Sequence, residues 1–261
     1  MHAMFESFVL PLLKDKYSTI ISKSKTLHVF GFGESKVNEI INPVIETERK
    51  LESGSVSFTI LAHLNGISIK TTITGEDELI IDELLHSIKA EFYKLLGNSI
   101  YGEDSQTLES VVGGLLIRHK KTLSLAESCT GGLLANKITN IPGSSLFFQG
   151  GIVSYSNHSK IEILKVNPGT IEKHGAVSEE TALEMANGAN KLTGSDFAAA
   201  LSGIAGPSGG TPEKPVGTVS FAVTGLKKPK TETMHFSGTR VEIKERSANH
   251  LLNMLRIELN K

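Results

Sequence analysis

The sequence predicts two globular units of mixed α and β structure, the second of them a layered α/β domain. The chain has 261 residues, of which 39% are hydrophobic, so each unit can bury a core. The stretch 97–105 is rich in turn residues and has little to bury, which suits a domain boundary. After residue 105, short β-rich runs alternate with helical patterns. We therefore predict one domain over 1–100 and a second over 105–261.

The first unit is predicted to be an α+β domain. A strand is expected at 26–32, and a helix is expected after Ser35. The runs 56–64 and 67–73 predict a hairpin with Asn65-Gly66 at its turn, because this dipeptide accepts the positive φ that a type I′ turn requires at both central positions. A helix follows, since apolar residues recur on one face from Ile81 to Leu96, and Gly97-Asn98 would end it.

The second unit is predicted to open with a helix from Leu108, where apolar residues follow helical spacing. Strands are then expected at 122–126, 151–155, 197–202, 216–223 and 231–236, and helices after Gly131, after Ser178 and over 248–259. This alternation favours helices layered on both faces of a sheet. Ligands of such sheets bind beside the loops that leave the strand ends, and both glycine-rich runs of the unit fall there.

Charge and cysteine content exclude several classes of protein. Lys and Arg number 27 against 28 Asp and Glu, and the net charge of -1 provides no overall positive field for nucleic acid or an anionic membrane. A single cysteine excludes an internal disulfide framework and a Cys-rich zinc site, which fits a reducing cytosol. The N-terminus has no export signal, and no apolar run is long enough to span a bilayer. We expect a cytoplasmic protein without nucleic-acid or membrane partners.

Residues 128–132 form the turn between a predicted strand and the helix that begins near Leu133. The first N–H groups of a helix are free, and glycines let an anion or a developing oxyanion approach them closely. Ser128 could act as a nucleophile here if a neighbouring base activates it. Capping of the helix by Ser128 or Thr130 is the commoner role for hydroxyls at such a position. Both interpretations remain open on pattern alone.

Three further segments carry polar groups at predicted strand ends. Tyr155, Asn157, His158 and Lys160 follow one strand, although a lone lysine is usually a surface charge. The glycine-rich loop 203–212 could present backbone N–H groups to an anion, but it matches neither the phosphate-loop nor the dinucleotide pattern. Arg240, before the last helix, could bind a phosphate or carboxylate. Each segment taken alone also fits an ordinary loop or a solvated turn.

Taken together, these segments closely resemble the nicotinamide-nucleotide amidase family, also called the CinA C-terminal domain. The match covers about 105–261 in order. The matching motifs are Ala126-Glu127-Ser128-Cys129-Thr130-Gly131-Gly132, Pro142-Gly143-Ser144-Ser145, Tyr155-Ser156-Asn157 with Lys160, His174-Gly175-Ala176-Val177-Ser178, the 203–210 loop with Lys214-Pro215-Val216-Gly217-Thr218, and Phe236-Ser237-Gly238 with Arg240. The resemblance implies hydrolysis of nicotinamide mononucleotide to nicotinate mononucleotide and ammonia, without a metal or other cofactor.

The resemblance also implies roles for individual residues. Ser128 would be the nucleophile, Lys160 its basic partner, and Tyr155 a participant in proton transfer or positioning. Backbone N–H groups near Thr130 to Gly132 would hold the oxyanion, while Arg240 and the 203–210 loop would face the 5′-phosphate. The residues expected to contact substrate are Thr130, Gly131, Gly132, Asn157, Gly203, Gly206, Gly209, Gly210 and Arg240. The chain departs from the family at Ser202 and Ser208, where Thr and Asp are usual, and at Thr239; none of the three belongs to the expected dyad.

The first unit resembles the KH-like middle module of full-length CinA proteins. Its segment Gly31-Phe32-Gly33-Glu34 lacks the Gly-x-x-Gly clamp and basic flanks of RNA-binding KH modules, so we expect a packing or spacer role. Residues 1–13 resemble the tail of a preceding domain that is associated with metal-dependent ADP-ribose pyrophosphatase activity. That domain is not in this sequence, and its activity is not carried over. The resemblance also implies a homodimer.

Two alternatives to a serine amidase remain open from the sequence. Cys129 stands beside Ser128, and a thiolate at a helix N-terminus is more nucleophilic than a hydroxyl. The chain could also be a non-catalytic nucleotide-binding or assembly protein, whose glycine-rich loops hold a ligand without breaking a bond.

Overall fold

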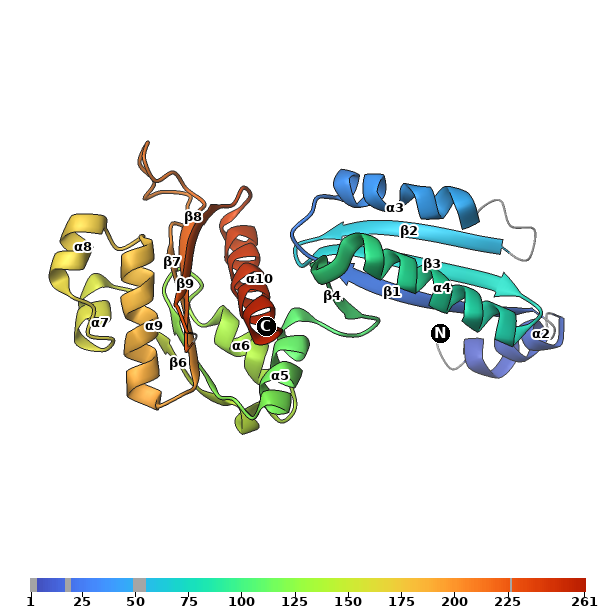
Figure 1. The fold of residues 1–261 in the computed structure, drawn as a ribbon, viewed down its shortest axis with the longest axis horizontal. Helices are drawn as coiled ribbons and strands as arrows, with labels where there is room; N and C mark the ends of the chain where they lie inside the picture. The colour runs from blue at the N-terminus through green and yellow to red at the C-terminus, as the bar shows by residue number, and fades with distance from the viewer. Residues whose placement is uncertain (1–3, 17–19, 49–54, 226) are drawn as a thin grey trace. The chain divides into compact units, whose positions relative to one another are not determined.

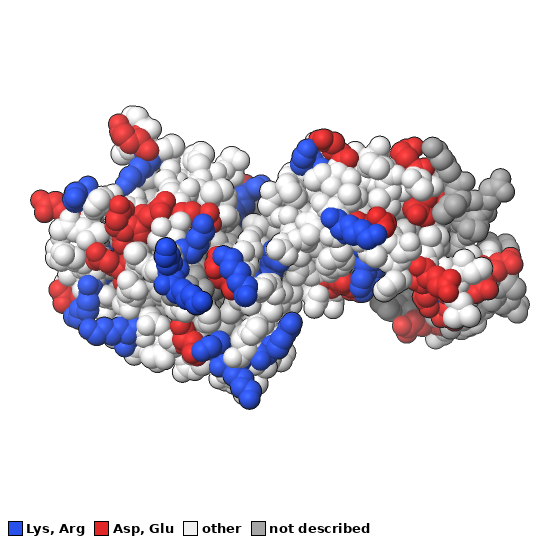
Figure 2. Space-filling view, in the orientation of Figure 1, with Lys and Arg blue, Asp and Glu red and all other residues white. Residues whose placement is uncertain are grey.

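The computed structural model describes residues 4–16, 20–48, 55–225 and 227–261, and the chain divides into two compact units, Met1–Ser105 and Gln106–Lys261 (Figure 1). Residues 1–3 of the segment expected to resemble a domain tail lie outside the described residues. No helix in the described ranges is long and apolar enough to cross a membrane. Basic and acidic side chains are intermixed on the face drawn in Figure 2, in keeping with the balanced composition.

The first unit is built on an antiparallel sheet with the strand order β2-β3-β1-β4, which confirms the predicted α+β class. Its strands are β1 (Ile21–Val29), β2 (Ser55–His63), β3 (Gly66–Gly75) and β4 (Ile100–Glu103). Its helices are η1 (Phe5–Val9), α2 (Leu10–Lys16), α3 (Glu34–Glu48), α4 (Glu78–Leu96) and the short η2 (Gly97–Ser99). The helix α4 begins where the Asp77 carboxylate accepts the amides of Leu79 and Ile80.

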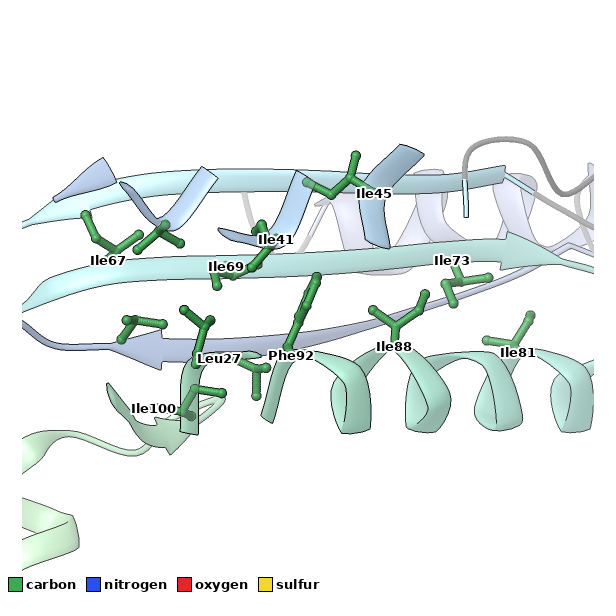
Figure 3. Close-up of a cluster of buried hydrophobic side chains, with 13 residues drawn as sticks. Leu27, Ile41, Ile45, Ile67, Ile69, Ile73, Ile81, Ile88, Phe92 and Ile100 are labelled. Atoms are coloured by element: carbon green, nitrogen blue, oxygen red, sulfur yellow. The ribbon is translucent and has the colours of Figure 1, made fainter. Parts of the chain in front are cut away.

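The core of this unit lies between the sheet and its two long helices (Figure 3). Alternate side chains of β3, such as Ile69 and Ile73, point into the core and meet Ile41 of α3 together with Ile88 and Phe92 of α4. All five are at most 1% exposed. The apolar residues repeat every second position along β3 and with helical spacing along α4. Each element therefore turns one apolar face toward the core, as the sequence predicts.

Two predictions about the first unit are wrong. The hairpin turn consists of Leu64 and Asn65, because His63 pairs with Gly66, and of the predicted turn pair only Gly66 has a positive φ. A Cβ at Gly66 would lie 2.2 Å from the Val29 carbonyl oxygen, so close backbone approach also requires glycine there. The stretch 97–105 is not merely a linker, since β4 pairs with β1 and buries Ile100 and Tyr101.

The second unit is a three-layer α/β/α domain around a five-stranded sheet of order β6-β5-β7-β8-β9. Its strands are β5 (Leu123–Glu127), β6 (Phe148–Val153), β7 (Phe197–Gly203), β8 (Thr218–Thr224) and β9 (Lys230–His235). Its helices are α5 (Leu108–His119), α6 (Leu133–Thr139), η3 (Ser144–Leu146), α7 (Asn157–Glu162), α8 (Pro168–His174), α9 (Glu179–Thr193) and α10 (Arg240–Leu259). The helix α8 was not predicted.

The sheet brings three loops to one edge. The strands β6, β5 and β7 are parallel neighbours, so the segments that follow them leave from the same end of the sheet. The helix α9 covers one face of this sheet, and α10 and α5 cover the other (Figure 1). Ser128 follows β5, Tyr155 follows β6, and the glycine-rich loop follows β7. This is the edge at which open α/β sheets bind ligands.

Candidate active site

Ser128 is placed by the strand that precedes it. Its amide donates to the Leu201 carbonyl oxygen at 3.1 Å, which extends the pairing of β5 with β7 by one residue. The side chain is only 6% exposed, yet it lines the main pocket at this edge of the sheet. The nucleophile candidate is therefore fixed by sheet geometry.

The start of α6 differs from the expectation that Ser128 or Thr130 caps it. The N-cap is Gly132, without a side-chain cap of its own. Instead the buried Glu127 carboxylate accepts the amides of Gly132, Leu134 and Ala135 at 2.7 to 3.1 Å. A carboxylate at a helix N-terminus satisfies the free amides and their positive partial charge.

This arrangement also changes the expected oxyanion site. The Gly132 amide bonds Glu127, and the Gly131 amide donates to the Ser128 carbonyl oxygen at 3.1 Å. In this geometry both amides already have acceptors, so their role at an oxyanion stays a prediction that requires these bonds to be exchanged. Thr130 is fully buried, and its hydroxyl has no hydrogen-bond partner among the described residues.

Lys160 meets Ser128 inside the protein. It belongs to α7, which begins with a reciprocal capping box between Ser156 and Ser159. Its side chain is 1% exposed, so the usual interpretation of a lone lysine as a surface charge does not hold. The Nζ atom lies 2.9 Å from Ser128 Oγ and donates to the Ser154 carbonyl oxygen, also at 2.9 Å.

The electrostatics of the site favour a neutral lysine. Burial lowers the pKa of Lys160 to about 8, because a buried ammonium loses hydration. The charge of Cys129 acts in the opposite direction, but less strongly. About a tenth of Lys160 is then unprotonated at pH 7 and about half at pH 8, and this form has a lone pair available to accept the Ser128 proton.

Cys129 is a poor candidate for the nucleophile. Burial raises the pKa of its thiol to about 12, since the negative thiolate loses hydration. The helix N-terminus that could have stabilised a thiolate is occupied by the Glu127 carboxylate. The geometry therefore favours the hydroxyl of Ser128 over the neighbouring thiol.

The pocket has a volume of about 280 Å³. Several predicted site residues line it, namely Ser128, Tyr155, Asn157, Lys160, Gly203, Gly206, Gly209 and Arg240. Cys129, Ala176, Val177, Ser202, Ile204, Ala205 and Ser208 complete the lining. Thr130, Gly131, Gly132 and Gly210, which were predicted to contact substrate, do not line it. Backbone and hydroxyl groups thus supply much of the polar surface, with one guanidinium and one amine.

Arg240 joins three loops at the rim of the pocket. It is the first residue of α10, where Thr239 and Glu242 form a capping box. Its guanidinium donates to the Gly206 carbonyl oxygen at 2.5 Å and to the Tyr155 hydroxyl at 3.0 Å. The Tyr155 side chain is exposed, and its hydroxyl contact is with Arg240 rather than with the dyad. Tyr155 is better placed to position Arg240 than to transfer a proton to Ser128.

One wall of the pocket is held by residues to which the sequence analysis gave no role. Ser202 Oγ donates to the Ala176 carbonyl oxygen at 2.6 Å. Lys214 Nζ donates to the carbonyl oxygens of His174 and Val177, both at 2.6 Å. These bonds tie the segment after α8 to β7 and to the far end of the glycine-rich loop.

Glu127 and Ser154 make hydrogen bonds at the site that the sequence did not predict. Glu127 carried one usable signal, an acidic residue at the end of an apolar strand directly before a helix. Ser154 carried none, because its role depends on which carbonyl oxygen faces Lys160, and that is set by the pairing of β6 with β5.

Comparison with known proteins agrees with this architecture. The family model for the CinA C-terminal domain matches residues 105–259, more than half of the chain. The chain belongs to the CinA family. The model for the KH domain of damage-inducible protein CinA matches residues 24–102, which accounts for the first unit.

Individual relatives support the same assignment. A CinA-like protein from Endomicrobium trichonymphae is 48% identical over 99% of this chain and 60% of its own length. The chain thus spans about 60% of the length of the curated relatives it matches. Among crystal structures, a competence/damage inducible protein from Agrobacterium tumefaciens is 40% identical with a TM-score of 0.57, covering 59% of this chain and 94% of its own. A CinA superfamily protein from Escherichia coli is 32% identical with a TM-score of 0.55, covering 62% and 97%.

Proposed function

We propose that the second unit is an amidase that converts nicotinamide mononucleotide and water to nicotinate mononucleotide and ammonia. The observation that carries this proposal is the buried contact of 2.9 Å between Lys160 Nζ and Ser128 Oγ at the floor of a small polar pocket. A serine needs an adjacent base to attack an amide, and a lysine can act as one when burial lowers its pKa toward neutrality. Both conditions meet at this pair.

In the first half of the reaction, Lys160 accepts the Ser128 proton while Ser128 Oγ bonds to the carboxamide carbon. The tetrahedral intermediate carries its negative charge on the former carbonyl oxygen. Since the amides of Gly131 and Gly132 have internal partners, the amide of Cys129, a residue that lines the pocket, is the one in this turn that would stabilise that charge. Collapse of the intermediate breaks the C–N bond, and Lys160 returns the proton to the departing ammonia.

In the second half, water attacks the acyl ester on Ser128. Lys160 accepts a proton from the water, and the second tetrahedral intermediate releases the nicotinate product while the proton returns to Ser128 Oγ. The lysine therefore acts as base and then as acid in each half. The atoms balance as one amide and one water giving one carboxylic acid and one ammonia.

The phosphate of the substrate would face the rim of the pocket. Arg240 places a guanidinium there, and only two of its five N–H donors are used by Tyr155 and Gly206. The glycine-rich loop brings Gly206 and Gly209 to the pocket with positive φ, a conformation that lets backbone approach a ligand closely. Guanidinium and backbone N–H groups are the usual partners of a phosphate.

The test is to incubate the full chain with nicotinamide mononucleotide and to measure ammonia together with nicotinate mononucleotide. We expect turnover by the unmodified chain and by Cys129→Ala, and none by Ser128→Ala. If Ser128→Ala is active and Cys129→Ala is not, the thiol is the nucleophile. If the chain binds the nucleotide but releases no ammonia at any pH from 6 to 10, it is a binding protein and the proposal is wrong.

A further inference from the structure

The buried dyad leaves one hydrogen-bond donor without an acceptor once it becomes charged. A lysine ammonium has three N–H donors. The Nζ atom of Lys160 has two partners in the structure, Ser128 Oγ and the Ser154 carbonyl oxygen. When Lys160 takes the proton, one N–H points toward the reacting atoms and one toward the carbonyl oxygen. The third then needs an acceptor in a site that water reaches poorly, because the side chain is 1% exposed.

A buried acceptor without a partner lies in the same residue that already contacts Nζ. Ser154 is 0% exposed, and its Oγ has no hydrogen-bond partner among the described residues. Ser154 does not line the pocket, so its missing partner is not a bound substrate. A buried hydroxyl without a partner destabilises a fold and calls for a specific reason.

Resting on the proposed amidase activity, we propose that Ser154 is a positioning residue whose hydroxyl accepts the third N–H of the Lys160 ammonium formed during the reaction. The Ser154 carbonyl oxygen lies 2.9 Å from Nζ, so the hydroxyl of the same residue is in the immediate neighbourhood of the amine. The hydroxyl lacks a partner while Lys160 is neutral and gains one when the lysine is charged. An interaction made only as charge develops lowers the barrier without tightening substrate binding.

The surroundings of Lys160 leave Ser154 as the group suited to this task. Cys129 is the titratable side chain that interacts with Lys160, and it offers no charged acceptor because burial raises the pKa of its thiol to about 12. Arg240 at the rim is a cation and accepts nothing. The other buried hydroxyl of this region without a partner among the described residues belongs to Thr130, whereas Ser154 also contacts Nζ through its own backbone.

The substitution Ser154→Ala tests the hydroxyl alone, because the backbone carbonyl remains. At pH 9, where most of Lys160 is neutral before the reaction, we expect kcat for nicotinamide mononucleotide to fall about 10- to 100-fold, as for the loss of a hydrogen bond to a charged group, with KM unchanged. The melting temperature should stay the same or rise, because a buried group without a partner is removed. A merely structural hydroxyl would instead lower stability and leave kcat unchanged.

Ser124→Ala is the matched control. Ser124 is also a fully buried serine of the same sheet, near the start of β5 and away from the pocket, but its hydroxyl has a partner, Ser195 Oγ at 2.8 Å. We expect this variant to melt at a lower temperature and to keep its kcat. The two variants should therefore show opposite patterns. Ser154→Ala should lose activity and keep its stability, whereas Ser124→Ala should lose stability and keep its activity.

A direct measurement of Lys160 separates this inference from the proposed function. Titration of the lysine Cε signals by NMR in 13C-labelled protein needs no substrate, and a hydroxyl that accepts from the ammonium raises the pKa of Lys160. Ser154→Ala should therefore shift the titration of Lys160 to lower pH, and Ser124→Ala should not. If the unmodified chain shows no turnover but Ser154→Ala still shifts the Lys160 titration, the proposed amidase activity is wrong and the hydrogen bond between Ser154 and Lys160 is supported. An unmoved titration or an unchanged kcat in an active Ser154→Ala variant overturns the role of Ser154.

Discussion

The two units use the same side chain in opposite ways. Lys25 of the first unit lies at the surface, bonded to Glu103 and Asp104 at 2.6 and 2.7 Å, and these hydrogen bonds raise the pKa of its amine. Lys160 of the second unit is buried, and its contacts are a hydroxyl and a carbonyl oxygen, so burial lowers its pKa to about 8. One amine is held charged, and the other gives up its proton more readily.

The difference separates a charge that stabilises a fold from one that can do chemistry. A lysine paired with carboxylates has no free lone pair at neutral pH, whereas a lysine deprived of both water and counter-charge does. The buried amine lowers the stability of the fold, because burial disfavours the charged form of the lysine in the folded state. Perturbed amines of this kind concentrate at functional sites.

The largest expected effect comes from removing the buried amine. Lys160→Met should lower kcat for nicotinamide mononucleotide by about a thousandfold or more, since the loss of a general base alone costs about 100- to 10,000-fold. It should also raise the free energy of unfolding at pH 7 by about 1 to 3 kcal/mol, because a buried amine with a lowered pKa is removed. Ammonia release and chemical denaturation measure the two quantities.

Lys25→Met is the control for that prediction. It makes the same substitution at a lysine of the first unit and should leave ammonia release unchanged. The loss of stability should be at most about 1 kcal/mol. Equal losses of activity in both variants would mean that the contrast between the two lysines has no bearing on catalysis.

The next effect concerns the carboxylates that cap a helix in each unit. Glu127→Gln should lower kcat about tenfold or more, because the turn that presents Ser128 is held through the amides at the start of α6. Asp77 caps α4 of the first unit, and Asp77→Ala should cost about 1 kcal/mol of stability without changing kcat. If both variants lose only stability, Glu127 is a cap and nothing more.

The pH dependence follows from the direction of the Lys160 shift. The neutral amine is the active form, so kcat/KM should rise with pH and level off above a pKa of about 8. Between pH 7 and 9 the neutral fraction, and with it the rate, should increase about tenfold. Ammonia release measured across this range gives the profile. A rate that is flat from pH 7 to 9 would show that Lys160 does not titrate as the base.

Much of this fold is visible in the sequence, and less of the site is. Apolar periodicity locates α4, α5 and the strands of both sheets, because buried faces repeat with the period of their element. It misses β4, whose four residues lie between turn residues and are buried through pairing with β1 rather than through their own pattern.

The site residues divide along the same line. Side chains that meet at strand ends, such as Ser128, Lys160 and Arg240, could be expected together, since parallel strands bring their loops to one edge. The roles of backbone groups could not be predicted in this way. Which amides remain free depends on hydrogen bonds that the local sequence does not determine. The Gly131 and Gly132 amides were assigned to an oxyanion for this reason, although Ser128 and Glu127 already bind them.

The smallest expected effect belongs to the ion pairs of the first unit. Partial burial of the Glu103 carboxyl acts to raise its pKa, but hydrogen bonds from Lys25, Lys89 and Tyr93 outweigh it and hold the pKa at about 2. Because the folded pKa is depressed, this contribution is complete above the ordinary value of 4.5 and is lost as pH falls toward 2. Glu103→Gln should therefore cost about 1 kcal/mol at pH 7, a modest amount since the side chain is 22% exposed, and much less at pH 3.

Tyrosine fluorescence can follow this loss in the intact chain. The sequence has no tryptophan, and three of its four tyrosines, at positions 17, 93 and 101, fall in the first unit. Urea unfolding at pH 7 and pH 3 should give a difference between the parent and Glu103→Gln that shrinks in acid, with ammonia release unchanged at pH 8. A deficit as large at pH 3 as at pH 7 would mean that Glu103 acts through packing, and a fall in turnover would mean that the charged network of the first unit is coupled to the site of the second.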